Sequence, residues 1–266
     1  EWSVDIEGSS DLIEIDEDKI FVTSSLYEIE VQDYTETTFF TFDKSGQLLG
    51  SVNFEEKPWF MKKQNQKIIL GIGRPRCGIL TIDDKYNISH SRTDGNSPVN
   101  MGIKTNKRFL LGHSDGTITE INDSGRKYIQ CGNDSITAIS SKDISWQAGD
   151  KNGNLFSSDG WSKKLGDRIN CIVETKHHIW VSVTSKNNVV YLLDKWSGSI
   201  KHQFSHDYKL QLMKLLDNNL AISDEEGKVM FFDTKTLEKR IGTKSVISED
   251  LERRNLLKKR LRALRE

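Results

Sequence analysis

Two arginines and a cysteine stand close together in the stretch GIGRPRCG, residues 71–78. A pair of guanidinium groups on one turn could hold a carboxylate or a phosphate through paired hydrogen bonds. The stretch lacks the third glycine of a dinucleotide-binding loop and the Gly-Lys-Ser/Thr of a P-loop. It also joins two strand-like runs, so no helix N-terminus is available to receive a phosphate. Arg74 and Arg76 are therefore a candidate anion site, with a plain hairpin as the alternative.

Metal chemistry is not favoured by the remaining candidates. His202 and His206 would share a face of a helix, but SIKHQFSH alternates as a strand does, and four strand steps span about 13 Å. The stretch DKNGNLFSSD, residues 150–159, has oxygen ligands at alternate positions but lacks the terminal acidic pair of a calcium loop. No local Ser-His-Asp or paired-carboxylate motif is present. We expect no metal, no cofactor and no catalytic residue.

Two tryptophans stand at equivalent places in the chain. Trp161 and Trp196 each follow by two positions an acidic residue that closes a strand-like run. A turn tip is normally exposed, and exposed tryptophan is enriched at binding hot spots. The alternative is that each ring folds onto its own sheet. The candidate partner-binding residues of these turns are Trp161, Trp196, Lys163, Lys164 and Lys195.

The elements that carry these residues repeat along the chain. An apolar run ending in Asp or Asn and followed by a polar turn recurs as FFTFDKSG, GILTIDDKYN, TITEINDSG, NLFSSDGWS, VVYLLDKWSG and VMFFDTKTLE. The key residues are Asp43, Asp83, Asn122, Asp159, Asp194 and Asp233, which lie 40, 39, 37, 35 and 39 positions apart. The fourth copy is the weakest, because Ser158 replaces the apolar residue. The closing side chain can hydrogen-bond the backbone two residues on, so we interpret it as a structural clasp for the next turn.

Each repeat contains four strand-like runs. In the fifth these are INCIVET, HIWVSVTS, VVYLLD and SIKHQF, in which polar and apolar residues alternate. Turns such as SDG, KNGN and DEEG precede the third run and favour tight hairpins. The first strand of each repeat is expected near residues 11, 58, 98, 136, 168 and 208.

Four antiparallel strands every 38 or so residues are typical of a β-propeller blade. In LDKWSGSI, FDKSGQLL and FFDTKTLE, the chain resembles the WD-repeat and quinoprotein-like (PQQ-like) propeller families over about residues 1–246. The six expected first strands predict an all-β, six-bladed β-propeller, followed by a C-terminal α-helix. Residues 2–7 would complete the last blade; seven blades would require a blade outside this chain. Enzymes among such propellers assemble a site from several loops at the channel mouth, which keeps an enzyme or a small-ligand binder as an alternative function.

The first repeat is longer than the others. SSLYEIEVQDYTETTF, residues 24–39, alternates throughout and predicts an extended hairpin. Such protrusions often carry contacts. A longer hairpin without a partner is the alternative.

The last segment, residues 247–266, predicts an amphipathic basic helix. Ser248 is a suitable N-cap, and the apolar face carries Leu257, Leu261 and Leu264. Three roles remain open: packing on the propeller or forming a coiled coil, linking to a further domain, or binding an acidic partner such as RNA or anionic lipid. The candidate partner-binding residues of the helix are Leu257, Leu261, Leu264, Arg253, Arg254, Lys258 and Arg262.

The bulk composition limits the function classes. The chain has 266 residues, 35% of them apolar, and a formal net charge of -1, which points to neither nucleic acid nor membrane. No run has the length of a membrane span. Three cysteines without a CxxC pair favour a reducing, cytoplasmic location. The chain opens at Glu1, so we expect an excised or processed chain whose targeting segment lies elsewhere.

We predict a non-catalytic scaffold with a propeller at residues 1–246 and a helix at 247–266. Its expected partners are proteins within a larger protein or complex. The alternatives are an enzyme or small-ligand binder at the channel mouth, and a nucleic-acid or ribosome-associated module that uses the basic tail and rim lysines.

Overall fold

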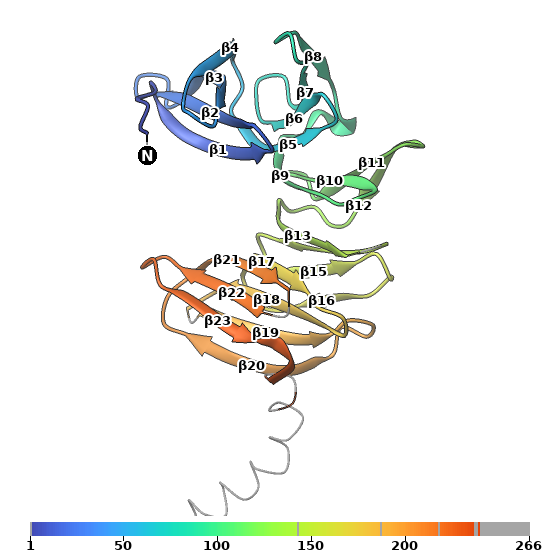
Figure 1. The fold of residues 1–266 in the computed structure, drawn as a ribbon. Coiled ribbons are helices and arrows are strands. Elements are labelled where there is room, and N and C mark those ends of the chain that lie inside the picture. Colours follow the sequence, from blue (N-terminus) through green and yellow to red (C-terminus); the bar gives the residue numbers. More distant parts are fainter. Residues whose placement is uncertain (1, 143, 187, 218, 237–238, 240–266) are drawn as a thin grey trace, which may run out of the picture. The chain divides into compact units, whose positions relative to one another are not determined.

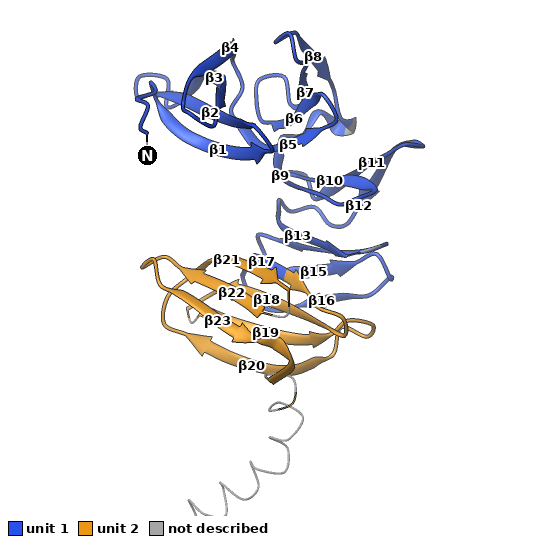
Figure 2. Cartoon of the chain, in the orientation of Figure 1, with its two compact units in different colours: residues 1–172 blue, residues 173–266 orange. Residues whose placement is uncertain are grey.

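A computed structural model describes residues 2–142, 144–186, 188–217, 219–236 and 239. Within these ranges the chain is all-β apart from short helical turns, and its strands form six antiparallel sheets (Figure 1). In every sheet the strands are hydrogen-bonded in sequence order. The chain divides into two compact units, residues 1–172 and 173–266, with the boundary inside one strand (Figure 2). Each unit is described by itself.

Unit 1 contains four sheets of four strands. The first sheet is β1 (Ser9–Asp16), β2 (Lys19–Glu28), β3 (Asp33–Asp43) and β4 (Leu48–Phe54). The second is β5 (Pro58–Gln64), β6 (Lys67–Ile72), β7 (Gly78–Ile82) and β8 (Ile88–Ser91), followed by the short 3-10 turn η1 (Asp94–Asn96). The third is β9 (Val99–Lys104), β10 (Arg108–His113), β11 (Thr117–Asn122) and β12 (Gly125–Gln130). The fourth is β13 (Ile136–Lys142), β14 (Ser145–Asp150), β15 (Asn154–Ser157) and β16 (Ser162–Lys164).

Unit 2 contains the fifth and sixth sheets. The fifth is β17 (Arg168–Glu174), β18 (His178–Thr184), β19 (Asn188–Asp194) and β20 (Ile200–His206). The sixth has three strands among the described residues: β21 (Leu210–Leu216), β22 (Asn219–Asp224) and β23 (Val229–Asp233). The predicted first strand of each repeat is confirmed, because β1, β5, β9, β13, β17 and β21 begin at or close to the expected positions.

Successive sheets of unit 1 pack face to face through apolar side chains. Phe39 and Leu70, from the first and second sheets, belong to one buried cluster. Phe60 and Phe109 join the second sheet to the third, with their ring centroids 6.1 Å apart. Ile136 belongs to the cluster between the third and fourth sheets. The second strand of the second sheet, β6 (KIILGI), contributes Ile68, Leu70 and Ile72 to the cluster with the first sheet, while Ile69 packs against the cluster with the third sheet, which explains its nearly continuous apolar sequence.

Glycines in the second strands allow this close packing. A Cβ atom on Gly71 would lie 2.5 Å from Val99, the first residue of β9. The same relation repeats one sheet later, where a Cβ on Gly112 would lie 2.6 Å from Cγ2 of Ile136. These separations are shorter than any side chain tolerates, so only glycine fits.

The clasp predicted at the end of the third strand is confirmed in most copies. The Asp43 carboxylate accepts hydrogen bonds from the backbone N–H groups of Ser45, at 2.8 Å, and Gln47, at 2.9 Å. Asp83, Asn122 and Asp194 each accept from the N–H two residues on. The fourth copy differs: the Asp159 N–H donates to the hydroxyl of Ser157 instead, at 3.2 Å. In the fourth copy, whose sequence fits the repeat least well, a serine hydroxyl therefore accepts the hydrogen bond in place of the Asp carboxylate.

The expectation that residues 2–7 complete the last sheet is not confirmed and stays a prediction. Trp2 lies against the first sheet, where its ring centroid is 6.4 Å from that of Phe42 and its Nε1 donates to the carbonyl of Lys44 at 2.8 Å. Residues 2–7 form no strand, and the sixth sheet has no fourth strand among the described residues. The indole has apolar surface to cover, and the neighbouring Gly46 leaves room for it.

Candidate functional site

The β2–β3 hairpin of the first sheet is the longest in the described chain and confirms the extended hairpin that the sequence predicts. β2 has 10 residues and β3 has 11, with a four-residue turn at 29–32. Tyr27 pairs with Tyr34 and Glu28 with Asp33, so the strands stay paired up to the turn, with one register shift between Leu26 and Tyr27. The tip is thus ordered backbone that presents side chains in fixed directions.

The end of this hairpin exposes apolar side chains within an acidic frame. Ile29 is 82% exposed, Val31 58% and Tyr27 53%. Between and beside them stand Glu28, Glu30 and Asp33, all exposed. We call Tyr27–Asp33 the hairpin tip. A single exposed apolar side chain needs no explanation, but three on one ordered protrusion are typical of a contact surface.

A nearly buried lysine holds the base of the hairpin. Lys57 Nζ lies 2.7 Å from a carboxylate oxygen of Asp11 and 3.5 Å from the ring centroid of Tyr34. The second Asp11 oxygen accepts a hydrogen bond from Ser25 of β2. Trp59, 48% exposed, has its ring 5.1 Å from the same ammonium. Burial lowers the pKa of Lys57, but Asp11 and Tyr34 outweigh this effect and raise the pKa above its ordinary value.

Lys57 therefore acts as a positioning group. Its charge is neutralised by Asp11, and its ammonium fixes the aromatic ring of Tyr34, which in turn contacts Tyr27 edge-on at 5.2 Å between ring centroids. The aromatic side chains beside the tip are held in place by this arrangement.

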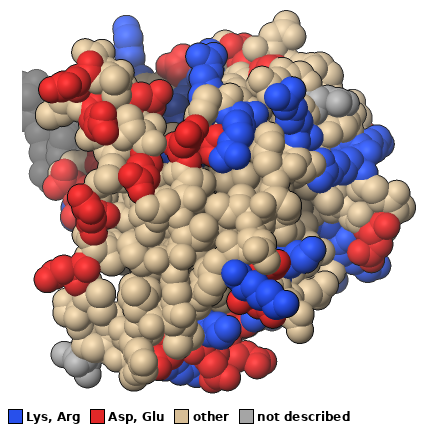
Figure 3. All heavy atoms as spheres, turned by 90° about the horizontal axis from the view of Figure 1, so that it is seen from above, with Lys and Arg blue, Asp and Glu red and all other residues tan. Residues whose placement is uncertain are grey.

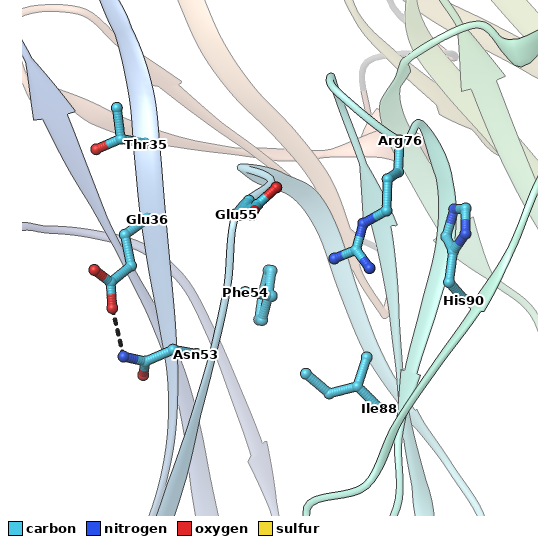
Figure 4. A pocket seen from close by; sticks show the side chains of 8 residues that line it. All are labelled: Thr35, Glu36, Asn53, Phe54, Glu55, Arg76, Ile88 and His90. Carbon is cyan, nitrogen blue, oxygen red and sulfur yellow. Dashed lines mark hydrogen bonds between the residues drawn. The ribbon is translucent and has the colours of Figure 1, made fainter.

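A groove of about 590 Å³ opens beside the base of the hairpin (Figure 4). It is lined by Thr35, Glu36, Asn53, Phe54, Glu55, Arg76, Ile88 and His90. Phe54 and Ile88 give it an apolar part, and the Asn53 amide donates a hydrogen bond to the Glu36 carboxylate. The Thr35 hydroxyl donates to Glu28 at 3.0 Å, so one side chain links the groove to the hairpin tip.

The guanidinium in this groove is already paired. Arg76 Nε and Nη2 lie 2.5 and 2.7 Å from the two oxygens of Glu56, whose side chain is fully buried. Burial raises the pKa of Glu56, but the hydrogen bonds and charge of Arg76 outweigh it, and the pKa ends below its ordinary value. Arg76 is therefore ion-paired with a carboxylate of its own chain. Arg74 is exposed on the turn and does not line the groove.

The charge around the groove is negative rather than positive. Three carboxylates, those of Glu36, Glu55 and Glu56, stand against the one guanidinium of Arg76. His90 Nε2 lies 2.8 Å from the carbonyl oxygen of Cys77. The arrangement does not favour the anion site that the two arginines suggested in the sequence, because Glu56 occupies the fork of the guanidinium.

The tryptophan turns differ from one another. Trp196, in unit 2, is 64% exposed, whereas Trp161, in unit 1, is half-buried. Lys195 is buried and ion-paired with Glu174, so its ammonium does not face solvent. Lys164 is exposed and donates to the carbonyl of Asn152, and Lys163 is half-buried on β16. Of these candidates, Trp196 offers the most free surface.

The candidate residues of the tail lie outside the described residues. They are Arg253, Arg254, Leu257, Lys258, Leu261, Arg262 and Leu264. The roles predicted for them stay predictions.

The thiols of Cys77 and Cys131 and the buried imidazole of His113 are poorly suited to chemistry. Burial raises the pKa of the Cys131 thiol to about 11 and also raises that of Cys77, so both are protonated at neutral pH. Burial lowers the pKa of His113, whose nitrogens lie 3.2 Å from the Ser97 carbonyl and 2.7 Å from the Thr119 hydroxyl. Within the ranges given above, no three metal-ligating side chains come together.

Surface charge is mixed. Figure 3 shows acidic and basic side chains interspersed on one face, with uncharged areas between them. A large basic field of the kind that binds nucleic acid does not cover this face. No helix in the described part of the chain has the length and apolar character to cross a membrane.

The fold and the site define an all-β repeat protein. Its antiparallel meanders are consistent with a β-propeller, and no specific family is identified. No family model matches the sequence, nor does any curated protein.

Solved structures with a similar fold exist. A chain of the structure titled "Crystal Structure of Mitotic Checkpoint Complex" is similar with a TM-score of 0.61 and 7% identity, over 79% of this chain and 71% of that chain. The computationally designed Ika8 protein is similar with a TM-score of 0.51 and 10% identity, over 86% of this chain and 97% of that chain. At such identities the likeness shows the fold alone.

Reasoning from the sequence found the hairpin but missed the network and the groove beside it. Three charged residues follow one another between β4 and β5. Glu55 lines the groove, Glu56 pairs with Arg76, and Lys57 pairs with Asp11. The only signal in the sequence was this charged run, which Pro58 separates from Trp59. Its partners lie too far away along the chain to be inferred from spacing.

Proposed function

We propose that this protein is a non-catalytic scaffold that binds a partner protein through the hairpin tip. The single observation that carries the proposal is the exposure of Tyr27, Ile29 and Val31 on an ordered, protruding hairpin. Apolar and aromatic side chains at the centre of a patch supply most of the binding energy of protein interfaces. Acidic neighbours keep the free protein from aggregating and form a polar rim.

The rigidity of the tip supports the proposal. The ion pair between Lys57 and Asp11 and the ring contact between Tyr27 and Tyr34 hold the hairpin before any partner arrives. A preorganised surface loses less side-chain entropy on binding, so more of the contact energy appears as affinity.

The test is affinity capture from native lysate with the full chain and the variant I29S/V31S. We expect the variant to lose the captured protein, because its apolar anchors are gone, while its Tm is unchanged, because exposed side chains contribute little to stability. The matched control is I144S, since Ile144 is also 82% exposed and belongs to the same unit. Capture that survives in I29S/V31S, or that falls equally in I144S, would contradict the proposal.

A further inference from the structure

The groove beside the hairpin is suited to a positively charged side chain. Glu36 and Glu55 line it, and the positive charge of Arg76 is offset by the buried Glu56. Counting these four groups leaves an excess of negative charge. Phe54 and Ile88 supply an apolar surface along which the methylene stem of a lysine or arginine would lie.

The hairpin tip has the same character. Glu28, Glu30 and Asp33 surround the exposed Ile29 and Val31. The nearest cation, Lys57, is neutralised by Asp11 and is nearly buried, so it does not offset these charges. Tip and groove are continuous through the hydrogen bond from Thr35 to Glu28.

We infer that the hairpin tip and the groove together dock a basic segment of a partner protein that carries apolar side chains. The apolar side chains of the segment cover Ile29 and Val31, and a lysine or arginine enters the groove beside Glu36 and Glu55. This inference rests on the proposed function and adds the chemistry of the partner. The acidic surface repels nucleic acid and anionic lipid headgroups, and it favours a cationic peptide by charge complementarity.

The test uses labelled synthetic peptides of about 12 residues as probes. One alternates leucine with lysine, one leucine with glutamate and one serine with lysine. Binding to the full chain is measured by fluorescence anisotropy at about 50 and about 200 mM NaCl, because charge contacts weaken with salt. We expect the leucine–lysine peptide to bind best and to bind more weakly at the higher salt.

Two variants with the same change in charge locate the site. E36Q/E55Q removes both groove carboxylates and keeps their size, while E17Q/D18N removes two exposed carboxylates at the β1–β2 turn. We expect the leucine–lysine peptide to bind about three- to tenfold more weakly to E36Q/E55Q and equally well to E17Q/D18N.

Several results would overturn the inference. The first is stronger binding of the leucine–glutamate peptide, and the second is equal weakening in both variants. A third is hairpin-dependent binding to vesicles that contain phosphatidylserine in place of peptide binding. Capture of the native partner that needs Ile29 and Val31 but is unchanged in E36Q/E55Q would overturn the basic partner and leave the scaffold function standing.

Discussion

Glu56 is the residue whose environment the fold controls most tightly. Its carboxylate is fully buried and accepts hydrogen bonds from Nε and Nη2 of Arg76. Burying a carboxylate is unfavourable unless a partner compensates it. The guanidinium of Arg76 remains partly exposed at the groove. Removing Arg76 therefore leaves a buried charge, whereas neutralising Glu56 leaves a cation that water can reach.

R76M should destabilise the protein more than E56Q does. R76M leaves the Glu56 charge buried without a partner, which costs about 3 kcal/mol. E56Q leaves a guanidinium that can turn toward water, and we expect a cost of about 1.5 kcal/mol. Urea unfolding at neutral pH measures both, and a larger loss in E56Q would contradict this account of the pair.

The dependence on pH follows from the direction of the pKa shift. The pKa of Glu56 in the folded wild type lies below its ordinary value of 4.5, so the contribution of the pair is present above that value and is lost as pH falls through the lowered pKa. R76M removes the side-chain hydrogen bonds and the charge of Arg76, so burial, the largest effect on Glu56, is opposed only by backbone hydrogen bonds and should raise the pKa of the Glu56 carboxyl. Protonation of Glu56 then removes the buried charge as pH falls from neutral. The difference in the free energy of unfolding between wild type and R76M should therefore become smaller between pH 7 and about pH 5.

Residue partners of this kind could not be predicted from the sequence. Glu56 and Arg76 are 20 positions apart and belong to different turns. Asp11 lies on β1 of the first sheet, whereas Lys57 directly precedes the second sheet. Local spacing says which residues share a strand face, but not which turns meet. Arg74 and Arg76 thus suggested an anion site because the buried carboxylate opposite Arg76 was not visible.

At the scale of the element, the second strands of the second, third and fourth sheets set how closely the next first strand approaches. Gly71, Gly112 and Gly149 would each place a Cβ about 2.5 Å from a β-branched residue in the first strand that follows. The sequence contained this repeat as ILGIG, LLGHSDG and QAGDKNG.

G112A should destabilise unit 1 by about 1–3 kcal/mol because the new methyl group collides with Ile136. I136A alone loses buried packing and costs about 2–5 kcal/mol. The double variant should lose less than the two single losses combined, by about 1 kcal/mol, because the collision is relieved. Thermal unfolding of all four proteins checks this, and strict additivity would show that the glycine has no role in the approach of the sheets.

The strands and most of the turns were predictable at this scale. Alternation and Asn-Gly or Asp-Gly turns are local properties, and they predicted the first strand of every sheet. The clasp followed from Asp43 and its equivalents because its hydrogen bonds reach only two residues along the chain. It failed at Asp159 because Ser157 offers the same acceptor from a different position.

At the scale of the whole molecule, the repeat was predictable and its completion was not. Near-equal spacing predicted a series of four-stranded antiparallel sheets, and the described residues contain such a series. The end of the series depends on contacts between distant segments, and the packing of Trp2 on Phe42 was not predicted from the sequence. The blade count stays a prediction.

The exposed surface was predictable in part. Residues 24–39 predicted a protruding hairpin, since alternation continued past the length of a normal strand. The groove needed the second sheet to be placed beside the first. Surface function is therefore harder to infer than the fold, because it depends on which side chains meet without any periodic pattern.

The central claim is that the hairpin tip contacts a partner protein. The most direct measurement places a photo-crosslinking benzophenone amino acid at position 29, and separately at position 144, in the full chain expressed in its native cells. Both positions are equally exposed isoleucines. The account predicts one defined crosslinked protein from position 29 and none from position 144. Crosslinks at neither position, or the same crosslinks at both, would contradict it.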